Sequence, residues 1–371
     1  MKYRSTTVSL LSAAAVVVAM GATPAQAVAH HTWDVEPGVG TISAAVAQAR
    51  PGDTIQLEAG TYWDSVGIPI TLTIRGAGEW TTVIKPPAHP KAVCDTPASG
   101  GNPASVEGLC PFGALDKMGN PIRSRPVMDV TISDLRLTGF SDSGVIGFNT
   151  KGLHVFDVRS DHNGGYGIAR FVSTDSLFEG NSVSYNGEAG LYMGDSPDAD
   201  SVLRNNWSDH NGYGLFMRDS TGLTATGNHV WGNCVGILAL NSGHGAPGDL
   251  PAGNYHIYGN TVWANDSACP AAGGPPTSGI GIALAGVHNT VVSGNWVTNN
   301  QPSGPSLISG GIVVLSTMAE GGANPMNNTV RDNYLDHNKP ADIVWDGSGS
   351  GNTISDNNCD TSLPPHMGFC G

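Results

Sequence analysis

Five side chains able to transfer protons or stabilise charge gather in two neighbouring repeats near the middle of the chain and in the loop that follows them. Tyr192 and Asp195 lie in the phrase "AGLYMGDS", Arg218 and Asp219 in the matching phrase "YGLFMRDS", and His244 follows in "NSGHGAP". A Tyr or an Arg can remove a proton, and a pair of carboxylates can act as acid and base in hydrolysis. Asp195 and Asp219 could also hold Ca²⁺ through oxygen ligands. These residues are the candidate catalytic set.

A structural interpretation of the same residues stays open beside the catalytic one. Asp195 and Asp219 share one turn position with Asn241, and Asp, Asn and Ser are common there because their side chains bond the backbone. His244 lies in a Gly-flanked insertion, where a solvent-facing histidine is equally expected. A surface ion pair between Arg218 and either carboxylate would contribute little energy.

The elements that would position these residues follow from a repeat. Seven Asn residues end a recurring phrase at intervals of 23, 25, 22, 32, 35 and 38 residues: Asn163, Asn186, Asn211, Asn233, Asn265, Asn300 and Asn338. A base period of 22–25 with tolerated insertions is typical of a solenoid. Asn at a fixed turn can adopt left-handed backbone angles, and stacked copies form a ladder. The triplet Asp-His-Asn, found at 161–163, 209–211 and 336–338, is therefore interpreted as structural rather than catalytic.

Each repeat contains two short runs with the alternation of β-strands. In the first run, the residue three positions before each Asn is small or apolar, so it should point inward. The residues on either side of it, such as Asp161, should then point outward. The outward positions also hold four tryptophans on consecutive repeats: Trp207, Trp231, Trp263 and Trp296. They predict a platform for sugar rings, with Phe216 of the second run as a further contact. The alternative is that the insertions 243–253, 266–278, 301–309 and 317–327 cover them.

The Asn-rich "GNxV…N…GI" phrasing resembles right-handed parallel β-helix proteins of the pectate-lyase-like superfamily. The segment 38–78 resembles the amino-terminal section of these proteins, which implies a short capping helix at about Ile42 to Ala49. The resemblance implies an all-β fold of roughly ten rungs in one domain, 28–371. Family epimerases place Asp-Pro-His after a Tyr-Gly-x phrase, and "YGIARF" (166–171) departs from that pattern. "SGHGAP" resembles the Gly-His-Gly of polygalacturonate hydrolases, but their doubled Asp and later Arg-x-Lys are missing.

The ends of the chain and the cysteines indicate export. Residues 1–27 have the charged start, the apolar run and the small residues of a secretory signal peptide, and no later stretch is apolar enough to span a membrane. Six cysteines allow disulfides, and proximity favours Cys94–Cys110, Cys234–Cys269 and Cys359–Cys370. The segment 86–126 is expected to be a long disulfide-tied loop.

The net charge of −14 excludes a basic nucleic-acid-binding surface and requires local cations for any anionic substrate. We expect a secreted monomer that engages a polysaccharide. The favoured activity is lyase cleavage of a uronate-containing glycan by β-elimination, with Ca²⁺ as a candidate cofactor. The alternatives are a glycoside hydrolase using the paired Asp and His, and a non-catalytic glycan-binding or cell-surface protein.

Overall fold

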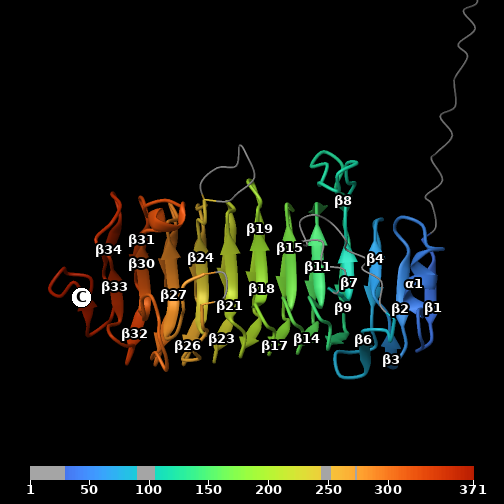
Figure 1. The fold of residues 1–371 in the computed structure, drawn as a ribbon, viewed down its shortest axis with the longest axis horizontal. Helices are drawn as coiled ribbons and strands as arrows, with labels where there is room; N and C mark the ends of the chain where they lie inside the picture. The colour runs from blue at the N-terminus through green and yellow to red at the C-terminus, as the bar shows by residue number, and fades with distance from the viewer. Residues whose placement is uncertain (1–29, 90–104, 244–251, 272–273) are drawn as a thin grey trace, which may run out of the picture.

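A computed structural model describes residues 30–89, 105–243, 252–271 and 274–371. Short strands wind into a coil whose turns stack along one long axis (Figure 1). All strand pairs of the three large sheets are parallel, and between the two ends of the coil the chain passes through the three sheets in the same order in every turn. The prediction of an all-β parallel β-helix in roughly ten rungs is confirmed.

The three sheets form the three sides of the coil. Sheet A comprises β1 (Thr32–Val35), β2 (Thr54–Leu57), β5 (Thr73–Arg75), β9 (Thr131–Ser133), β13 (His154–Phe156), β16 (Leu177–Glu179), β19 (Ser201–Arg204), β22 (Leu223–Thr226), β25 (His256–Tyr258), β28 (Val291–Ser293), β31 (Thr329–Arg331) and β34 (Thr353–Ser355). Sheet B comprises β3 (Gly60–Trp63), β6 (Thr82–Lys85), β10 (Arg136–Thr138), β14 (Arg159–Asp161), β17 (Ser182–Ser184), β20 (Trp207–Asp209), β23 (His229–Trp231), β26 (Thr261–Trp263), β29 (Trp296–Thr298) and β32 (Tyr334–Asp336). Sheet C comprises β4 (Val66–Ile68), β7 (Leu109–Pro111), β11 (Val145–Phe148), β15 (Ile168–Phe171), β18 (Ala189–Gly194), β21 (Tyr213–Arg218), β24 (Val235–Leu240), β27 (Ile280–Ala285), β30 (Gly310–Leu315), β33 (Ile343–Trp345) and β35 (Ser362–Leu363). A two-stranded sheet pairs β8 (Val127–Met128) with β12 (Thr150–Lys151), and a short 3₁₀ helix, η2 (Met318–Glu320), lies in an insertion.

The N-terminal end of the coil is closed by one helix, as the sequence predicts. Helix α1 (Thr41–Val46) starts after Gly40, whose φ of 68° is in the left-handed region that glycine tolerates. It buries Ile42, Ala45 and Val46 against the first turns of the coil, so it shields the apolar interior there from water.

The interior is filled by columns of side chains that repeat from strand to strand. In sheet B the column that runs from Ser160 through Val183, Ser208 and Val230 is fully buried, which confirms the predicted inward position. Because the strands are parallel and in register, like residues stack on like residues, and one apolar core runs along the coil.

Two asparagine ladders hold the corners of the coil. At the corner between sheets B and C, each Asn side chain donates from Nδ2 to the Oδ1 of the next Asn at 2.8–3.2 Å along the predicted series Asn163, Asn186, Asn211, Asn233, Asn265, Asn300 and Asn338. A second series at the corner between sheets A and B does the same through Asn181, Asn206, Asn228, Asn260, Asn295, Asn333 and Asn357.

The predicted ladder is confirmed, but the predicted left-handed backbone of its Asn residues is wrong. The left-handed residue is the one before each Asn, as at His162, Tyr185 and His210 with φ of 54–55°. That residue turns the chain, which leaves the Asn side chain free to point into the corner and bond its neighbours.

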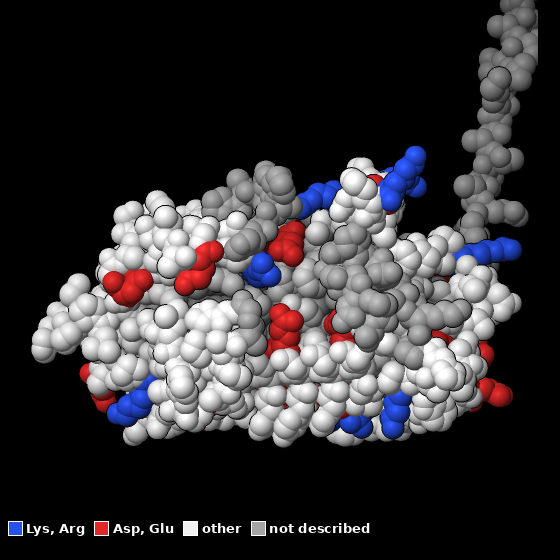
Figure 2. Space-filling view, in the orientation of Figure 1, with Lys and Arg blue, Asp and Glu red and all other residues white. Residues whose placement is uncertain are grey.

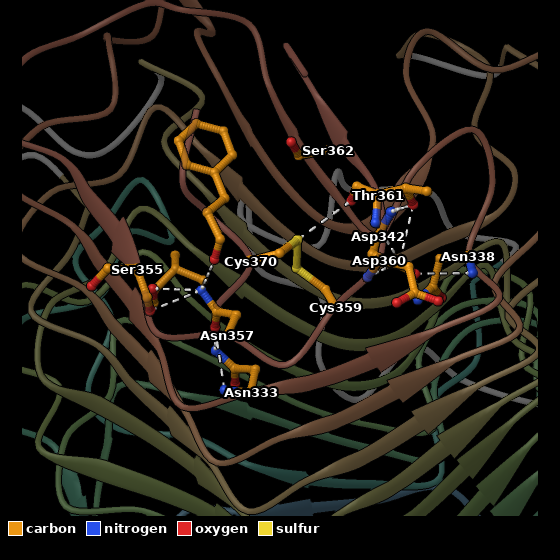
Figure 3. Close-up of a disulfide and its surroundings, with 12 residues drawn as sticks. Asn333, Asn338, Asp342, Ser355, Asn357, Cys359, Asp360, Thr361, Ser362 and Cys370 are labelled. Atoms are coloured by element: carbon orange, nitrogen blue, oxygen red, sulfur yellow. Dashed lines mark hydrogen bonds between the residues drawn. A yellow bond between two sulfur atoms is a disulfide. The ribbon is translucent and has the colours of Figure 1, made fainter. Parts of the chain in front are cut away.

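The C-terminal end of the coil uses a disulfide and an acidic residue to close both ladders (Figure 3). Asn357 donates from Nδ2 to the Phe369 carbonyl at 3.2 Å, and Asn338 donates to Asp342 Oδ1 at 3.0 Å. The disulfide Cys359–Cys370 ties the final segment to this end of the coil.

The predicted disulfides Cys234–Cys269 and Cys359–Cys370 are confirmed. Cys110 is also disulfide-bonded, but its predicted partner Cys94 lies outside the described residues. The segment 86–126, expected to be one loop, contains the strand β7, which pairs with β4 and β11. Three residues are too short a run for alternation to reveal a strand.

The long insertions leave the coil at the two corners that border sheet C. Segments 266–278 and 301–309 connect strands of sheet B to strands of sheet C, and 243–253 and 317–327 connect sheet C to sheet A. Ile308 packs on the apolar outer face of sheet C, so at least one insertion covers part of that face. Sheet C is therefore bordered on both sides in the middle and C-terminal part of the coil.

Candidate active site on the outer face of sheet C

The Asp-His-Asn triplets are structural in the described chain, although Asp161 differs from its prediction. Asp161 was expected to point outward into solvent, but it is fully buried because Arg136 and Arg159 fold over it. Arg136 donates to both carboxylate oxygens at 2.7 and 2.9 Å, and Thr138 donates at 2.8 Å. Burial alone would raise the pKa of Asp161, but these hydrogen bonds hold it at about 2. Asp161 therefore has no free oxygen for chemistry.

The outer face of sheet C carries an aromatic strip. Phe148 stacks on Phe171 with ring centroids 5.2 Å apart, Phe171 lies 4.6 Å from Tyr192, and Tyr192 lies 5.2 Å from Phe216. Tyr192 and Phe216 occupy one outward column in register, as predicted. In Figure 2, which faces this sheet, acidic and basic side chains gather near the middle of the face.

Arg218 brings the predicted residues together. It follows Met217 at the end of β21, and its side chain is 31% exposed. Burial lowers the pKa of Arg218, but the nearby Tyr192, Asp219 and Asp195 raise it more, so the guanidinium stays charged. Of the predicted catalytic residues, Tyr192, Asp195, Arg218 and Asp219 thus share one neighbourhood, and His244 lies outside the described residues.

The carboxylate of Asp219 is fully engaged. It accepts from Arg218 Nε at 3.0 Å, from the Ser242 backbone N–H at 2.8 Å and from the Ser242 hydroxyl at 2.5 Å. Ser242 Oγ also accepts from Arg218 at 3.1 and 3.2 Å. Asp219 therefore fixes the guanidinium and is itself 4% exposed, which suits a supporting role.

The same contacts bear on the prediction of Ca²⁺ at Asp195 and Asp219. Calcium requires six to eight oxygen ligands, whereas the Asp219 oxygens are taken by N–H and O–H donors and a cation lies beside them. No group of three or more acidic, His or Cys side chains that could hold a metal occurs in the described segments. The donors around Asp219 do not fit a calcium ion.

Two residues that the sequence interpretation missed complete the cluster. Tyr166 Oη donates to Glu188 Oε1 at 2.6 Å, and the Tyr166 ring lies 4.8 Å from the Tyr192 ring. Desolvation raises the pKa of Glu188, and burial together with Glu188 raises the pKa of Tyr166. Their sequence signal was weak because Tyr166 and Glu188 lie at the start of their sheet C runs, whereas the predicted residues lie at the ends.

Tyr192 lies beneath this pair and is fully buried. Burial raises its pKa well above the ordinary value, so the phenol is neutral at physiological pH. Its hydroxyl has no hydrogen-bond partner among the described residues, which is unusual for a buried polar group.

The four predicted tryptophans lie on consecutive strands of sheet B, away from the Arg218 cluster. Trp231 and Trp263 stack on each other at 4.9 Å, and Trp296 stacks on Tyr334 at 4.0 Å. Trp207 and Trp296 are 45% and 51% exposed. Stacking covers one face of each of these rings.

Comparison with known proteins agrees with this architecture. A family model for the right-handed β-helix region matches residues 116–262. The A-module of the Azotobacter vinelandii mannuronan C-5 epimerase AlgE6 superimposes with a TM-score of 0.57 at 17% identity, covering 86% of this chain and 85% of that chain. No curated protein sequence matches the chain.

Two further solved structures share the fold. DFA-IIIase from Arthrobacter chlorophenolicus superimposes with a TM-score of 0.56 at 13% identity, covering 90% of this chain and 95% of that one. An alginate lyase from Paenibacillus superimposes with a TM-score of 0.51 at 14% identity, covering 86% and 99%. None of the helices in the described segments is long and apolar enough to cross a membrane. The strand register, the asparagine ladders and the comparisons together show that the chain has the right-handed parallel β-helix fold.

Proposed function

We propose that the protein is a secreted polysaccharide lyase that cleaves a uronate-containing glycan by β-elimination on the outer face of sheet C. The observation that carries the proposal is the charged Arg218 on the same outer face as the hydrogen-bonded pair Tyr166–Glu188, whose pKa values its charge lowers. In a chain with a net charge of −14, a fixed cation at this position favours an anionic sugar locally.

The reaction needs three functions, and the cluster offers a residue for each. Arg218 pairs with the uronate carboxylate and so makes the proton on the neighbouring carbon, C5, easier to remove. Glu188 takes this proton, the C5–H electrons form the C4=C5 double bond, and the C4–O bond breaks. Tyr166 gives its phenolic proton to the departing oxygen. Glu188 then returns a proton to Tyr166 across their 2.6 Å hydrogen bond, which restores the starting state.

The direction of the Glu188 pKa shift supports its role as the base, and the burial of Tyr192 argues against the role that the sequence suggested for it. The raised pKa of Glu188 makes it a stronger base than an ordinary carboxylate. Tyr192, which the sequence offered as a base, is buried and neutral, so it lines the site beneath Tyr166.

The names of two similar folds suggest which substrates to test first. One relative is a mannuronan C-5 epimerase and another is an alginate lyase. Epimerisation begins with the same proton removal at C5 but returns a proton instead of breaking the C4–O bond. A hydrolase using Asp195, Asp219 and His244 remains the runner-up, although the contacts of Asp219 leave it little freedom to act on a substrate.

We expect the purified protein to release unsaturated uronates from alginate or pectate, measured by their ultraviolet absorbance. Replacing Glu188 with Gln is expected to lower turnover about a hundredfold or more, because general base catalysis is lost.

The base must be ionised to act, and its pKa is raised. Wild-type activity is therefore expected to fall as the pH drops through that raised pKa, which lies above the range of an ordinary Glu. Asp142→Asn, which removes a neighbouring carboxylate that raises the Glu188 pKa, should move this fall to lower pH without abolishing turnover.

New reducing ends without unsaturated products would overturn elimination and favour the hydrolase. Loss of the C5 hydrogen to solvent without chain cleavage would indicate an epimerase. If no glycan reacts at all, the protein is better described as a binding module.

Secretion belongs to the same proposal. The two described disulfides require an oxidising compartment, and an exported enzyme meets polysaccharides outside the cell. The predicted signal peptide, residues 1–27, lies outside the described residues. We expect a monomer, which sedimentation can check.

The outer face of sheet B supports a second candidate activity, binding of a neutral glycan. The outward positions of β20, β23, β26, β29 and β32 hold only aromatic residues, His, Thr and Asp, so nothing there attracts an anion. Trp207 and Trp296 are the most exposed aromatic residues on these strands, and aromatic rings bind the apolar faces of sugars.

Replacing Trp207 and Trp296 with Ala is expected to weaken retention on an insoluble neutral polysaccharide about three- to tenfold. Turnover of short soluble uronates should not change, because sheet C is untouched. Tyr258→Ala is the matched control, since Tyr258 is a similarly exposed aromatic residue on sheet A. Equal retention of all three proteins would refute binding on sheet B.

A further inference from the structure

Arg170 occupies the interior of the coil, where arginine is rare. It is the third residue of β15, in register with Gly147 before it and with Met193 and Met217 after it. This column points inward, and Arg170 has no solvent exposure. The register of β15 with β11 and β18 is continuous, so no register shift turns Arg170 outward.

The guanidinium is only partly satisfied. Nη1 donates to the Ser196 hydroxyl through a short hydrogen bond and to the Gly194 carbonyl at 3.4 Å. Nε and Nη2 have no hydrogen-bond partner among the described residues. Burial lowers the pKa of Arg170 to about 10, so the side chain still carries its charge in neutral solution.

The residues that Arg170 contacts form the turn that carries Asp195. Asp195 adopts a left-handed φ of 54°, between Gly194 and Ser196. Ser196 Oγ donates to the Gly194 carbonyl at 2.7 Å and accepts from the Ser173 backbone N–H at 2.9 Å. Arg170 thus binds, from the inside, the one turn that joins β18 to sheet A below the site.

The opposite side of this turn faces the catalytic cluster. A Cβ placed on Gly194 would lie 2.0 Å from the Tyr192 hydroxyl, so this phenol packs directly over Gly194. The Asp195 N–H donates to the Arg218 carbonyl at 3.1 Å. The Gly194–Ser196 turn is therefore held by Arg170 within the coil, by Tyr192 on the outer face and by the Arg218 backbone on the next rung.

We propose that Arg170 is a positioning residue that fixes the Gly194–Ser196 turn from inside the coil and so aligns Asp195, Tyr192 and Arg218 for the reaction. It reaches no substrate, because the sheet separates it from the outer face. The assignment of a catalytic effect rests on the proposed function, whereas the effect on the turn does not.

The energetics of the column support this assignment. Met193 and Met217 fill the same position on the next two rungs and need no hydrogen bonds. A buried charge with two unsatisfied donors costs stability relative to such an apolar residue. If Arg170 contributed only to folding, a methionine at this position would give a more stable protein.

The test is Arg170→Met in the full chain, followed by three measurements. The thermal midpoint is expected to rise by about 2 °C or more, as unsatisfied buried donors are removed. Hydrogen exchange at the Asp195 and Ser196 amides is expected to become about tenfold faster, because the turn loses its inner anchor. On a uronate glycan, kcat is expected to fall about tenfold while KM stays within about twofold.

Met193→Leu, an apolar change in the same column, is the control for interior packing and should alter none of the three. Arg170→Lys, which keeps the charge and one donor, should restore part of kcat. A lower thermal midpoint in Arg170→Met would overturn the proposal, because it would show that the arginine serves stability. Unchanged exchange at the turn or unchanged kcat would overturn it as well. If the wild-type protein cleaves no glycan, the proposed function fails, and the exchange and thermal measurements still decide whether Arg170 anchors the turn.

Discussion

Replacing Arg218 with Ala is expected to lower kcat/KM on a uronate glycan by about a hundredfold or more. The guanidinium is the charged group placed to pair with a sugar carboxylate, and a charge-assisted, two-pronged contact that strengthens as negative charge develops contributes about this much. The decisive measurement compares a glycan with its methyl-esterified form. Wild type should prefer the free acid strongly, and Arg218→Ala should lose most of that preference, because the ester carries no charge for the guanidinium to bind.

Two variants separate this electrostatic effect from damage to the fold. Arg218→Lys keeps a positive charge without the planar fork, so it should retain an intermediate activity. Arg204→Ala removes another partly exposed arginine, which pairs with Glu179 at 2.7 Å on sheet A, and should leave kcat/KM unchanged. If Arg218→Ala keeps the wild-type preference for the free acid, the proposed substrate contact is wrong.

The fold was predictable because the constraint on each rung is local and repeated. Asn233 and Asn265 are separated by 32 residues, yet their side chains meet at 2.9 Å, and an insertion between them changes only a loop. A buried amide must find partners, and a stacked copy of itself supplies both a donor and an acceptor. The sequence therefore predicts which residues stack on which, and the strands then follow from alternation.

The site was predictable only where it uses the same repeat. Tyr192, Asp195, Arg218 and Asp219 occupy matching positions of two rungs, so the repeat alone places them side by side. The burial of Asp161 was missed because alternation predicts which way a side chain points, but not whether other side chains cover it. Arg136 and Arg159 fold over Asp161, which would otherwise be exposed. The pair Tyr166–Glu188 was missed because its contact crosses between rungs at positions that do not match, and no pattern in one sequence signals such a contact.

The corners at which the insertions leave the coil were also beyond the sequence pattern. Insertions could be assigned to rungs by counting, but the corner from which each leaves depends on where the preceding strand ends. The tryptophans lie on sheet B, whereas the long insertions start or end at strands of sheet C. For this reason the reaction is proposed on sheet C and neutral glycan binding on sheet B.

Replacing Asn260 with Ala is expected to destabilise the fold by about 3–5 kcal/mol, a large effect for one polar residue. Asn260 is buried, and it donates from Nδ2 to Asn295 Oδ1 and to the Ala225 carbonyl, both at 2.9 Å. Its Oδ1 accepts from the Asn228 backbone N–H at 3.0 Å and from Asn228 Nδ2 at 2.9 Å. The truncation leaves these groups without partners in the interior, where each unmade hydrogen bond costs about 1–3 kcal/mol. Urea unfolding measures the loss through the transition midpoint.

The matched control is Asn352→Ala at the final rung. Asn352 makes the same kind of contact, accepting from Asn328 Nδ2 at 3.0 Å and donating to the Pro325 carbonyl at 2.9 Å, but it is half-buried. Water can replace its lost partners, so we expect a cost of about 1 kcal/mol or less. We infer that an Asn hydrogen bond stabilises the fold strongly only where it is buried. Equal losses of unfolding free energy in Asn260→Ala and Asn352→Ala would contradict this inference. A small loss at both positions would mean that the stacked strands and the apolar core hold the coil together without the asparagines.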